Sequence, residues 1–265
     1  MTERAPPPAP GTQRWVSLMV HDLEASQRFY QALFGWEYQA GPQRLGPYVR
    51  ALRDGRPVAG LGQIPPGERR LVAWLPYIAT QNADATATRI RDCGGTVAVG
   101  PLDFSGGGRL AIAADLHGAP FGLWQGGGRG PLPDADGVPV WNELVTAEAW
   151  PVSMFYVTAL GYEVAPDPSV PEDVDYLLLR LGDHSVAGVR GVGDALPHDR
   201  GAHWLPYFSA RDPDATAERA RKLGAQVQRE PENGWLGRTV WLSDPEGAPF
   251  AVLRPSRPLR RGEDR

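Results

Sequence analysis

The sequence predicts an α+β fold built from four copies of one βαβββ module, two in each half of the chain. Residues 15–36 read as a strand, a capped helix and a glycine stop, and the same unit returns 126 residues later at residues 141–162. A second pair of similar segments starts at Trp74 and Trp204, 130 residues apart. Repeats of this length indicate that copies of one supersecondary unit are assembled together.

The first unit begins with an apolar run, Trp15 to Val20, that suits a buried strand. Asp22 stands where a helix N-cap is expected, and Phe29 is one of several apolar residues that recur at helical spacing after it. Gly35 follows the last of them, at a position where a glycine commonly ends a helix. The segment therefore predicts a strand, a helix and then a new strand from Trp36.

The rest of the first half predicts a hairpin, a second helix and further strands. Asp54-Gly55 separates two strand-like runs, and Asp-Gly between apolar runs is a strong hairpin signal. Residues 84–93 read as a helix that ends at Gly94-Gly95. The expected strands are residues 48–53, 57–63, 74–80, 96–99, 109–114 and 120–124.

The second half repeats this arrangement, which places a domain boundary between the halves. The segment WLPYIATQNADATATRIRDCGG from Trp74 corresponds to WLPYFSARDPDATAERARKLGA from Trp204. Residues 126–139 have the Gly- and Pro-rich composition of a linker. We therefore expect a disordered tail at 1–12, a first domain at 13–125, a linker at 126–139, a second domain at 140–254 and a basic tail at 255–265.

Composition and charge exclude several classes of partner. A net charge of −4 gives no reason to expect nucleic acid or an anionic membrane surface. No apolar run approaches the roughly 20 residues of a membrane span. The single cysteine, Cys93, excludes an intramolecular disulfide and fits a reducing cytoplasm. The expected partner is a small molecule, and the sequence leaves open whether the chain forms a homodimer.

The repeated unit resembles the vicinal oxygen chelate superfamily, which includes glyoxalase I, extradiol dioxygenases and bleomycin-resistance proteins. The resemblance lies in DLEASQRFYQALFGW from Asp22 and in DLHGAPF and DPEGAPF at the close of the two halves. The WNEL at Trp141 and the paired WLPY segments are similar to two-domain glyoxalase-like proteins of high-GC bacteria. This resemblance covers about residues 13–254 and implies that two modules pair edge to edge in each half, enclosing one cleft per domain.

The resemblance also implies where a metal would bind, and the residues at those positions cannot bind one. Metal-dependent members take ligands from the start of each module's leading strand and from a glutamate in its last strand. The matching positions here are Trp15, Leu75, Gly122, Trp141, Leu205 and Ala251. None of these residues offers a His or carboxylate donor. We therefore expect no metal and no other cofactor.

Aromatic side chains are expected at or near several of the positions that bind the metal in metal-dependent members. Strand alternation puts Trp15 and Ser17 on one face of the first leading strand, and Trp141 on the matching face of the second. Tyr77, Tyr207 and Trp124 are expected on the same faces. The predicted ligand-binding residues of the two clefts are therefore Trp15, Ser17, Tyr77, Trp124, Trp141 and Tyr207. Such rings would stack on a flat or cationic ligand; the alternative is that they only fill clefts that lost a metal.

Two polar residues are candidates for catalysis. Glu143 is the one carboxylate expected inside a cleft, and His203 shares strand parity with Leu205 and Tyr207. A Glu and a His that converge could serve as general base and general acid. The alternative is that Glu143 bonds to backbone groups and that His203 only marks a strand start.

Three functions remain open from the sequence. The first is a metal-independent protein that binds an aromatic or otherwise flat small molecule in a Trp-lined cleft, in secondary metabolism, antibiotic biosynthesis or antibiotic resistance. The second is a cofactor-independent enzyme that uses Glu143. The third is a metal-dependent glyoxalase-like lyase, isomerase or dioxygenase with displaced ligands. Whether the chain is catalytic, and which cleft it uses, stay open at this point.

Overall fold

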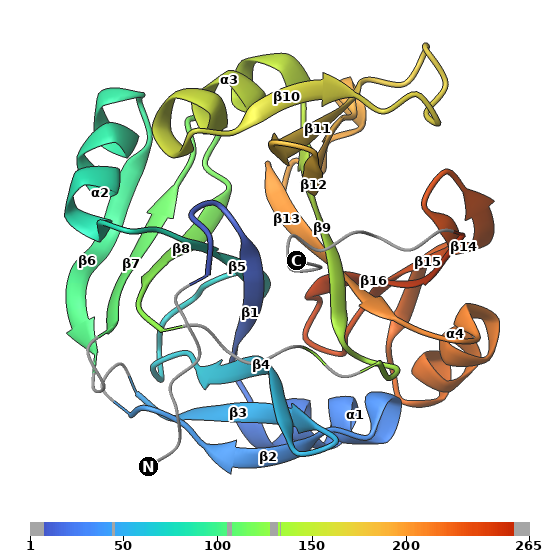
Figure 1. Ribbon diagram of the computed structural model, residues 1–265. Helices are drawn as coiled ribbons and strands as arrows, with labels where there is room; N and C mark the ends of the chain where they lie inside the picture. The colour runs from blue at the N-terminus through green and yellow to red at the C-terminus, as the bar shows by residue number, and fades with distance from the viewer. Residues whose placement is uncertain (1–7, 44–45, 105–107, 128–131, 133, 257–265) are drawn as a thin grey trace.

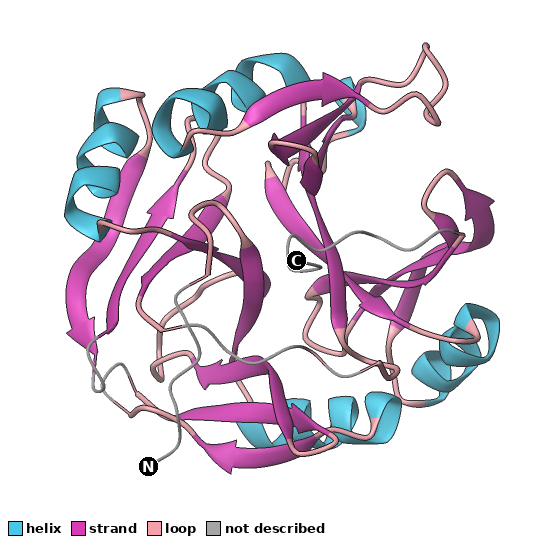
Figure 2. Ribbon diagram, viewed as in Figure 1, coloured by secondary structure: helices cyan, strands magenta, loops and turns pink. Residues whose placement is uncertain are grey.

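The computed structural model describes residues 8–43, 46–104, 108–127, 132 and 134–256. Within this part of the chain, two eight-stranded mixed sheets form, and four α-helices lie on the outside of the molecule (Figures 1 and 2). The α+β class and the four βαβββ modules predicted from the repeats are confirmed, as is their pairing into two sheets, one from each half of the chain.

The first sheet is assembled from β1 to β8 in the order β2-β3-β4-β1-β5-β8-β7-β6. At its centre β1 runs antiparallel to β5, with Trp15 opposite Tyr77 and Ser17 opposite Leu75. The two modules therefore meet edge to edge through their leading strands. The strands are β1 Gln13–Val20, β2 Glu37–Ala40, β3 Tyr48–Arg53, β4 Arg56–Gln63, β5 Ala73–Ala79, β6 Thr96–Phe104, β7 Gly108–Ala114 and β8 Pro120–Gln125.

The second sheet repeats this topology in the order β10-β11-β12-β9-β13-β16-β15-β14. Its central pair is β9 against β13, with Trp141 opposite Tyr207 and Glu143 opposite Leu205. Because the register is the same in both sheets, residues of these strands in the first half correspond one to one with residues of the second half. The strands are β9 Pro139–Thr146, β10 Glu163–Pro166, β11 Tyr176–Leu181, β12 His184–Gly191, β13 His203–Ser209, β14 Gln226–Gly234, β15 Gly237–Ser243 and β16 Pro249–Pro255.

The ends of helices α1 and α2 follow capping signals of the sequence. Helix α1, Leu23–Phe34, begins after Asp22, whose side chain accepts a hydrogen bond from the Ala25 N–H, and ends at Gly35 with φ of 70°. Helix α2, Ala83–Asp92, lies one residue earlier at each end than the prediction, because Asn82 takes the N-cap role. The other two helices are α3, Ala149–Leu160, and α4, Pro213–Lys222.

The helices of the two halves pack against each other. Helix α1 lies beside α4 and α2 beside α3, as Figure 1 shows. One core joins Tyr30 and Leu33 of α1 to Phe208 and Phe250 of the second sheet. The other joins Phe121 of the first sheet to residues of the second half, among them Phe155, Tyr156 and Trp204. Each core therefore contains residues of both halves. The helix-bearing face of each sheet is buried partly by residues of the other half.

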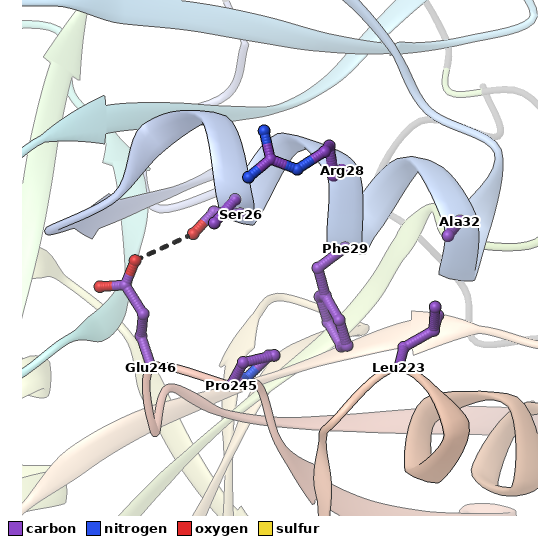
Figure 3. Close-up of a pocket in the computed structure, with 8 residues that line it drawn as sticks. Ser26, Arg28, Phe29, Ala32, Leu223, Pro245 and Glu246 are labelled. Atoms are coloured by element: carbon purple, nitrogen blue, oxygen red, sulfur yellow. Dashed lines mark hydrogen bonds between the residues drawn. The ribbon is translucent and has the colours of Figure 1, made fainter.

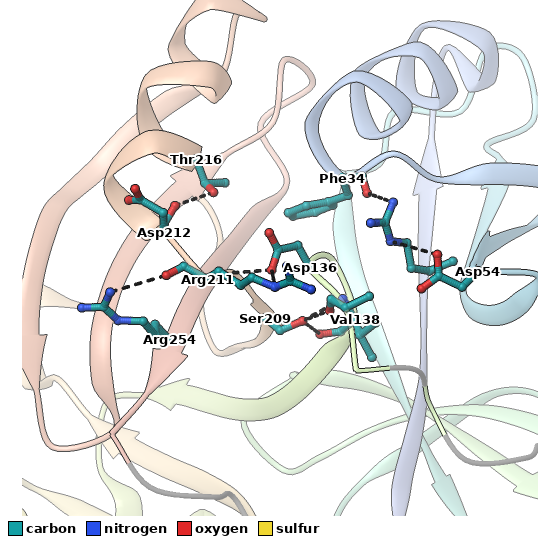
Figure 4. Close-up of polar contacts among 11 residues, drawn as sticks. Phe34, Asp54, Asp136, Val138, Ser209, Arg211, Asp212, Thr216 and Arg254 are labelled. Carbon is teal, nitrogen blue, oxygen red and sulfur yellow. Dashed lines mark hydrogen bonds and ion pairs between the residues drawn. The ribbon is translucent and has the colours of Figure 1, made fainter.

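The chain between the sheets is held against β13. Ser209 donates a hydrogen bond from its hydroxyl to the Ala135 carbonyl, and the same hydroxyl accepts one from the Val138 N–H at 3.1 Å (Figure 4). The Arg211 N–H donates to the Asp136 carboxylate at 3.0 Å. Thus the described end of the predicted linker is fixed to the second sheet.

The expected tails lie largely outside the described residues. In the described part of the chain, every helix is too short or too polar to cross a membrane.

Candidate functional site

Each sheet has a face that points away from the helices, which we call its inner face. In β1, Val16 and Leu18 enter the core with α1, so the alternating residues Trp15 and Ser17 belong to the inner face of the first sheet. In β9, Leu144 enters the other core, so Trp141 and Glu143 belong to the inner face of the second sheet. The residues predicted to bind ligand therefore lie on the inner faces.

A hydrogen-bonded cluster lies at the centre of the first inner face. The indole Nε1 of Trp15 donates to the Ser17 hydroxyl at 3.0 Å and to the Tyr48 hydroxyl at 3.1 Å. The two hydroxyls are 2.8 Å apart and share a further hydrogen bond. Ser17 is 1% exposed, whereas Tyr48 is half-buried. Sequence reasoning missed Tyr48, because its approach to Ser17 depends on the pairing of β3 with β4 and of β4 with β1.

Glycines leave room for the aromatic rings on this face. A Cβ at Gly60 would collide with the Tyr48 hydroxyl, and a Cβ at Gly122 would collide with the Tyr77 ring. Trp124 covers Gly108 in the same way. The rings of Tyr77 and Trp124 therefore take the space over these glycines, and both side chains are half-buried. The first inner face is thus aromatic and partly open.

Arg50 is a cation on the first inner face that the sequence reasoning missed. It pairs in register with Gly60, which in turn pairs with Ser17, so the three residues share one face. The side chain is half-buried, and its Nε is buried without a hydrogen-bond partner. Arg50 makes no hydrogen bond or ion pair with any described residue. The signal that could have found it is the alternation of β3, which puts Tyr48 and Arg50 on the same side.

The second inner face is closed by an ion pair. Glu143 is fully buried, and its Oε1 accepts a 2.7 Å hydrogen bond from the Nε of Arg190. Arg190 Nη2 lies 3.4 Å from Oε2, and the Tyr207 hydroxyl donates to Oε1 at 3.2 Å. Glu143, predicted to lie inside a cleft, therefore accepts hydrogen bonds from the side chains of Arg190 and Tyr207.

Aromatic rings surround the Arg190 guanidinium. Its central carbon lies 4.7 Å from the Trp235 ring centre, 5.2 Å from that of Trp241 and 5.7 Å from that of Tyr176. Burial alone would lower the pKa of Arg190, but the charge of Glu143 and the hydrogen bond to it, with smaller effects of Tyr207 and Tyr176, together raise that pKa above its ordinary value. Arg190 therefore keeps its positive charge and occupies the space over the second inner face.

His203 lies at the start of β13, 8% exposed, opposite Val145. Its Nδ1 is 2.8 Å from the Gly201 carbonyl, and this is the hydrogen bond that holds the ring. Burial lowers the pKa of His203 below its ordinary value, which favours the neutral ring at pH 7. Among the described residues, Glu143 and His203 have separate hydrogen-bond partners. Their joint role as base and acid stays a prediction from the sequence.

The resemblance to the vicinal oxygen chelate superfamily implies a metal that these residues do not fit. In the described chain, no three His, Cys, Asp or Glu side chains gather closely enough to hold an ion. At Gly122, the position expected for a closing glutamate, the Tyr77 ring takes the space that a side chain would need. Ala251 occupies the matching position in the second sheet and is fully buried opposite Tyr207. The donor set at these positions therefore cannot coordinate a divalent ion.

A separate groove of about 410 Å³ lies at the seam between α1 and the second half (Figure 3). It is lined by Ala25, Ser26, Arg28, Phe29, Ala32, Leu223, Pro245 and Glu246. The Glu246 carboxylate already accepts hydrogen bonds from the backbone N–H groups of His21 and Asp22, at 2.7 and 2.9 Å. Its acidic group therefore caps α1 across the seam, and the groove offers a ligand mainly apolar surface.

Comparisons with known proteins match nearly the whole length of the chain. Residues 143–253 match the family described as a glyoxalase-like domain, and residues 14–49 match the bleomycin resistance protein-like N-terminal family. CFP32 of Mycobacterium tuberculosis, whose name suggests a glyoxylase, is 35% identical over 93% of this chain and 95% of its own. The anthracycline biosynthesis protein DnrV of Streptomyces peucetius is 35% identical over 96% of this chain and 95% of its own.

Solved structures share the fold at low sequence identity. A variant of homoprotocatechuate 2,3-dioxygenase from B. fuscum, in complex with HPCA, has a TM-score of 0.64 at 15% identity. The alignment covers 95% of this chain and 73% of the dioxygenase. The Mn(II)-bound glyoxalase from Novosphingobium aromaticivorans has a TM-score of 0.62 at 18% identity, covering 95% of this chain and 86% of the glyoxalase. These likenesses show the arrangement of two paired sheets.

Proposed function

Because this chain belongs to the glyoxalase-like proteins of the vicinal oxygen chelate superfamily, we propose that it binds a flat aromatic small molecule without a metal. The ligand site is the inner face of the first sheet, formed around Trp15, Ser17, Tyr48 and Tyr77. The observation that carries this proposal is the partly open aromatic face beside the buried Trp15–Ser17–Tyr48 hydrogen bonds.

The contrast between the two sheets favours the first. Tyr77 is half-buried, whereas its counterpart Tyr207 is 1% exposed and donates to Glu143. Leu75 is likewise half-buried, and its counterpart Leu205 is 1% exposed. A ligand on the second face would have to displace Arg190 from a buried carboxylate, which leaves that charge unpaired. A ligand on the first face meets the half-buried ring of Tyr77 and does not have to break the Glu143–Arg190 ion pair.

The names of two relatives point to a class of ligand. DnrV and DauV, both 35% identical to this chain, are anthracycline biosynthesis proteins. Anthracyclines are planar fused rings that carry phenol and quinone oxygens. Planar rings suit stacking on Tyr77 and Trp124, which contributes about 0.5–1.5 kcal/mol per aromatic pair beyond area burial. The hydroxyl of the half-buried Tyr48 can donate a hydrogen bond to, or accept one from, such an oxygen.

Binding of quinizarin (1,4-dihydroxyanthraquinone) tests the proposal. Calorimetry should give stoichiometric binding to the wild type, and chromatography of the recovered dye should separate binding from turnover. Tyr77→Leu removes the accessible ring and should weaken binding about tenfold, equivalent to about 1.4 kcal/mol. The matched variant Tyr207→Leu should leave the affinity unchanged, although it lowers stability. Absence of binding to the wild type, or equal effects of the two variants, would contradict the assignment.

A further inference from the structure

We infer that Arg50 receives a carboxylate of the ligand, so that the molecule bound on the first inner face is a planar aromatic acid. This inference rests on the proposed function and adds the chemical class that the site selects. The guanidinium lies on the face that carries Trp15, Ser17 and Tyr48, and it has no partner among the described residues.

An arginine without an acceptor is unusual on a partly buried face. The Nε of Arg50 is shielded from solvent and makes no hydrogen bond. A buried donor that loses water without gaining a partner destabilises the fold, and more so when it carries charge. The planar guanidinium also presents two parallel N–H donors to a carboxylate. The arrangement fits a partner that arrives with the ligand.

The second sheet shows what an arginine on this surface pairs with. Arg190 directs its Nε and Nη2 to the two carboxylate oxygens of Glu143 and lies over aromatic rings. At the corresponding positions the first sheet has Gly62 in place of Arg190 and Ser17 in place of Glu143. The second inner face thus contains both the cation and its anion, whereas in the described part of the first inner face Arg50 is not paired with a carboxylate. Leu178 stands at the position that matches Arg50.

Two anthraquinones that differ in one group isolate the contact with Arg50. Anthraquinone-2-carboxylate and 2-(hydroxymethyl)anthraquinone have the same ring system, so stacking on Tyr77 is common to both. A charged hydrogen-bonded pair should make the wild type prefer the acid by about 10- to 100-fold, measured by calorimetry. Arg50→Leu, which copies Leu178 of the second sheet, should remove this preference and keep the affinity for the alcohol.

Two further variants keep the test decisive. Arg50→Gln retains donors without charge and should lose the preference too, and thermal unfolding shows which variants are folded. Arg28→Leu removes an exposed cation beside the seam groove and should leave the preference intact. If both compounds bind equally to the wild type, or if Arg50→Leu keeps the preference, the inference about Arg50 fails while the proposed function stands. If neither compound binds, the proposed function fails together with it.

Discussion

The Arg190 guanidinium donates a 2.7 Å hydrogen bond to the fully buried carboxylate of Glu143 on the neighbouring strand. A buried pair of this kind gives little net stability compared with apolar residues, but removal of one partner leaves an uncompensated charge in the interior. The pair therefore fixes the second inner face in a closed form, and Glu143 is part of that closure.

Glu143→Gln should lower the free energy of unfolding by about 3 kcal/mol, because Arg190 then lacks a counter-charge. Arg190→Gln should cost a similar amount, and the double variant should cost less than the sum of the two. Urea unfolding measures all three. Asp103→Asn breaks an exposed pair with Arg109, and should cost at most about 1 kcal/mol.

A different result for Glu143→Gln would make Glu143 a catalytic candidate again. A Glu143→Gln variant of unchanged stability that loses ligand binding or turnover would show that the carboxylate acts on a ligand. Binding of quinizarin to the wild type and to this variant decides the matter, since we expect equal affinities.

The two halves are joined by a symmetric pair of hydrogen bonds. Tyr30 of α1 donates to the Asp244 carboxylate at 2.9 Å, and Tyr156 of α3 donates to Asp115 at 3.0 Å. Tyr30→Phe and Tyr156→Phe should each lower the free energy of unfolding by about 1–3 kcal/mol, since a buried carboxylate oxygen loses its donor. Urea unfolding of both variants checks this. A loss in one variant and none in the other would contradict the symmetric role of the two bonds at the seam.

These aspartates should also make stability depend on pH. Burial raises the pKa of Asp115 and Asp244, and the hydrogen bonds that they accept only partly oppose it. A carboxyl group whose pKa is higher in the folded than in the unfolded state stabilises the fold most below about pH 3.9, the ordinary aspartate value. That contribution is lost as the pH rises through the raised pKa.

Comparison with a variant isolates this effect from other titrating groups. The free energy of unfolding of the wild type, minus that of the Asp115→Asn/Asp244→Asn double variant, should fall as the pH rises above about 4. Urea unfolding at a series of pH values gives this difference. A difference that rises with pH would show that these carboxyl groups are stabilised in their charged form.

Much of the fold could be predicted from the sequence because local signals and repeats agree. Asp22 and Gly35 mark the ends of α1, and the return of the same unit in the second half indicates a second copy. The shared cores could not be predicted in this way. The contact between Tyr30 and Phe250, for example, depends on how the two sheets meet.

Of the candidate site, the sequence could predict only which face of its own strand each residue occupies. Alternation placed Trp15, Ser17 and Glu143 on inner faces, where the structure has them. The partner of Glu143 lies on β12, and the partners of Trp15 include Tyr48 on β3. These contacts depend on register between strands far apart in sequence, which no single-strand pattern contains. For the same reason Arg50 and Arg190 were not among the predicted site residues.

Metal content is a further prediction. The protein purified without chelator should contain less than one equivalent of zinc, nickel, iron or manganese, because Trp15, Leu75 and Gly122 offer no donor groups. Elemental analysis measures the content, and treatment with EDTA should leave quinizarin binding unchanged. A stoichiometric ion whose removal abolishes binding would contradict metal-independent binding.

The central claim, that the ligand lies on the first inner face, is tested most directly by ¹⁹F NMR of protein labelled with 5-fluorotryptophan. Single Trp→Phe variants assign the resonances. Addition of quinizarin should shift the signals of Trp15 and Trp124 and leave those of Trp141 and Trp235 in place, because the Glu143–Arg190 pair closes the second face. Shifts of Trp141 and Trp235 with Trp15 and Trp124 unmoved would place the ligand on the second inner face and contradict the claim.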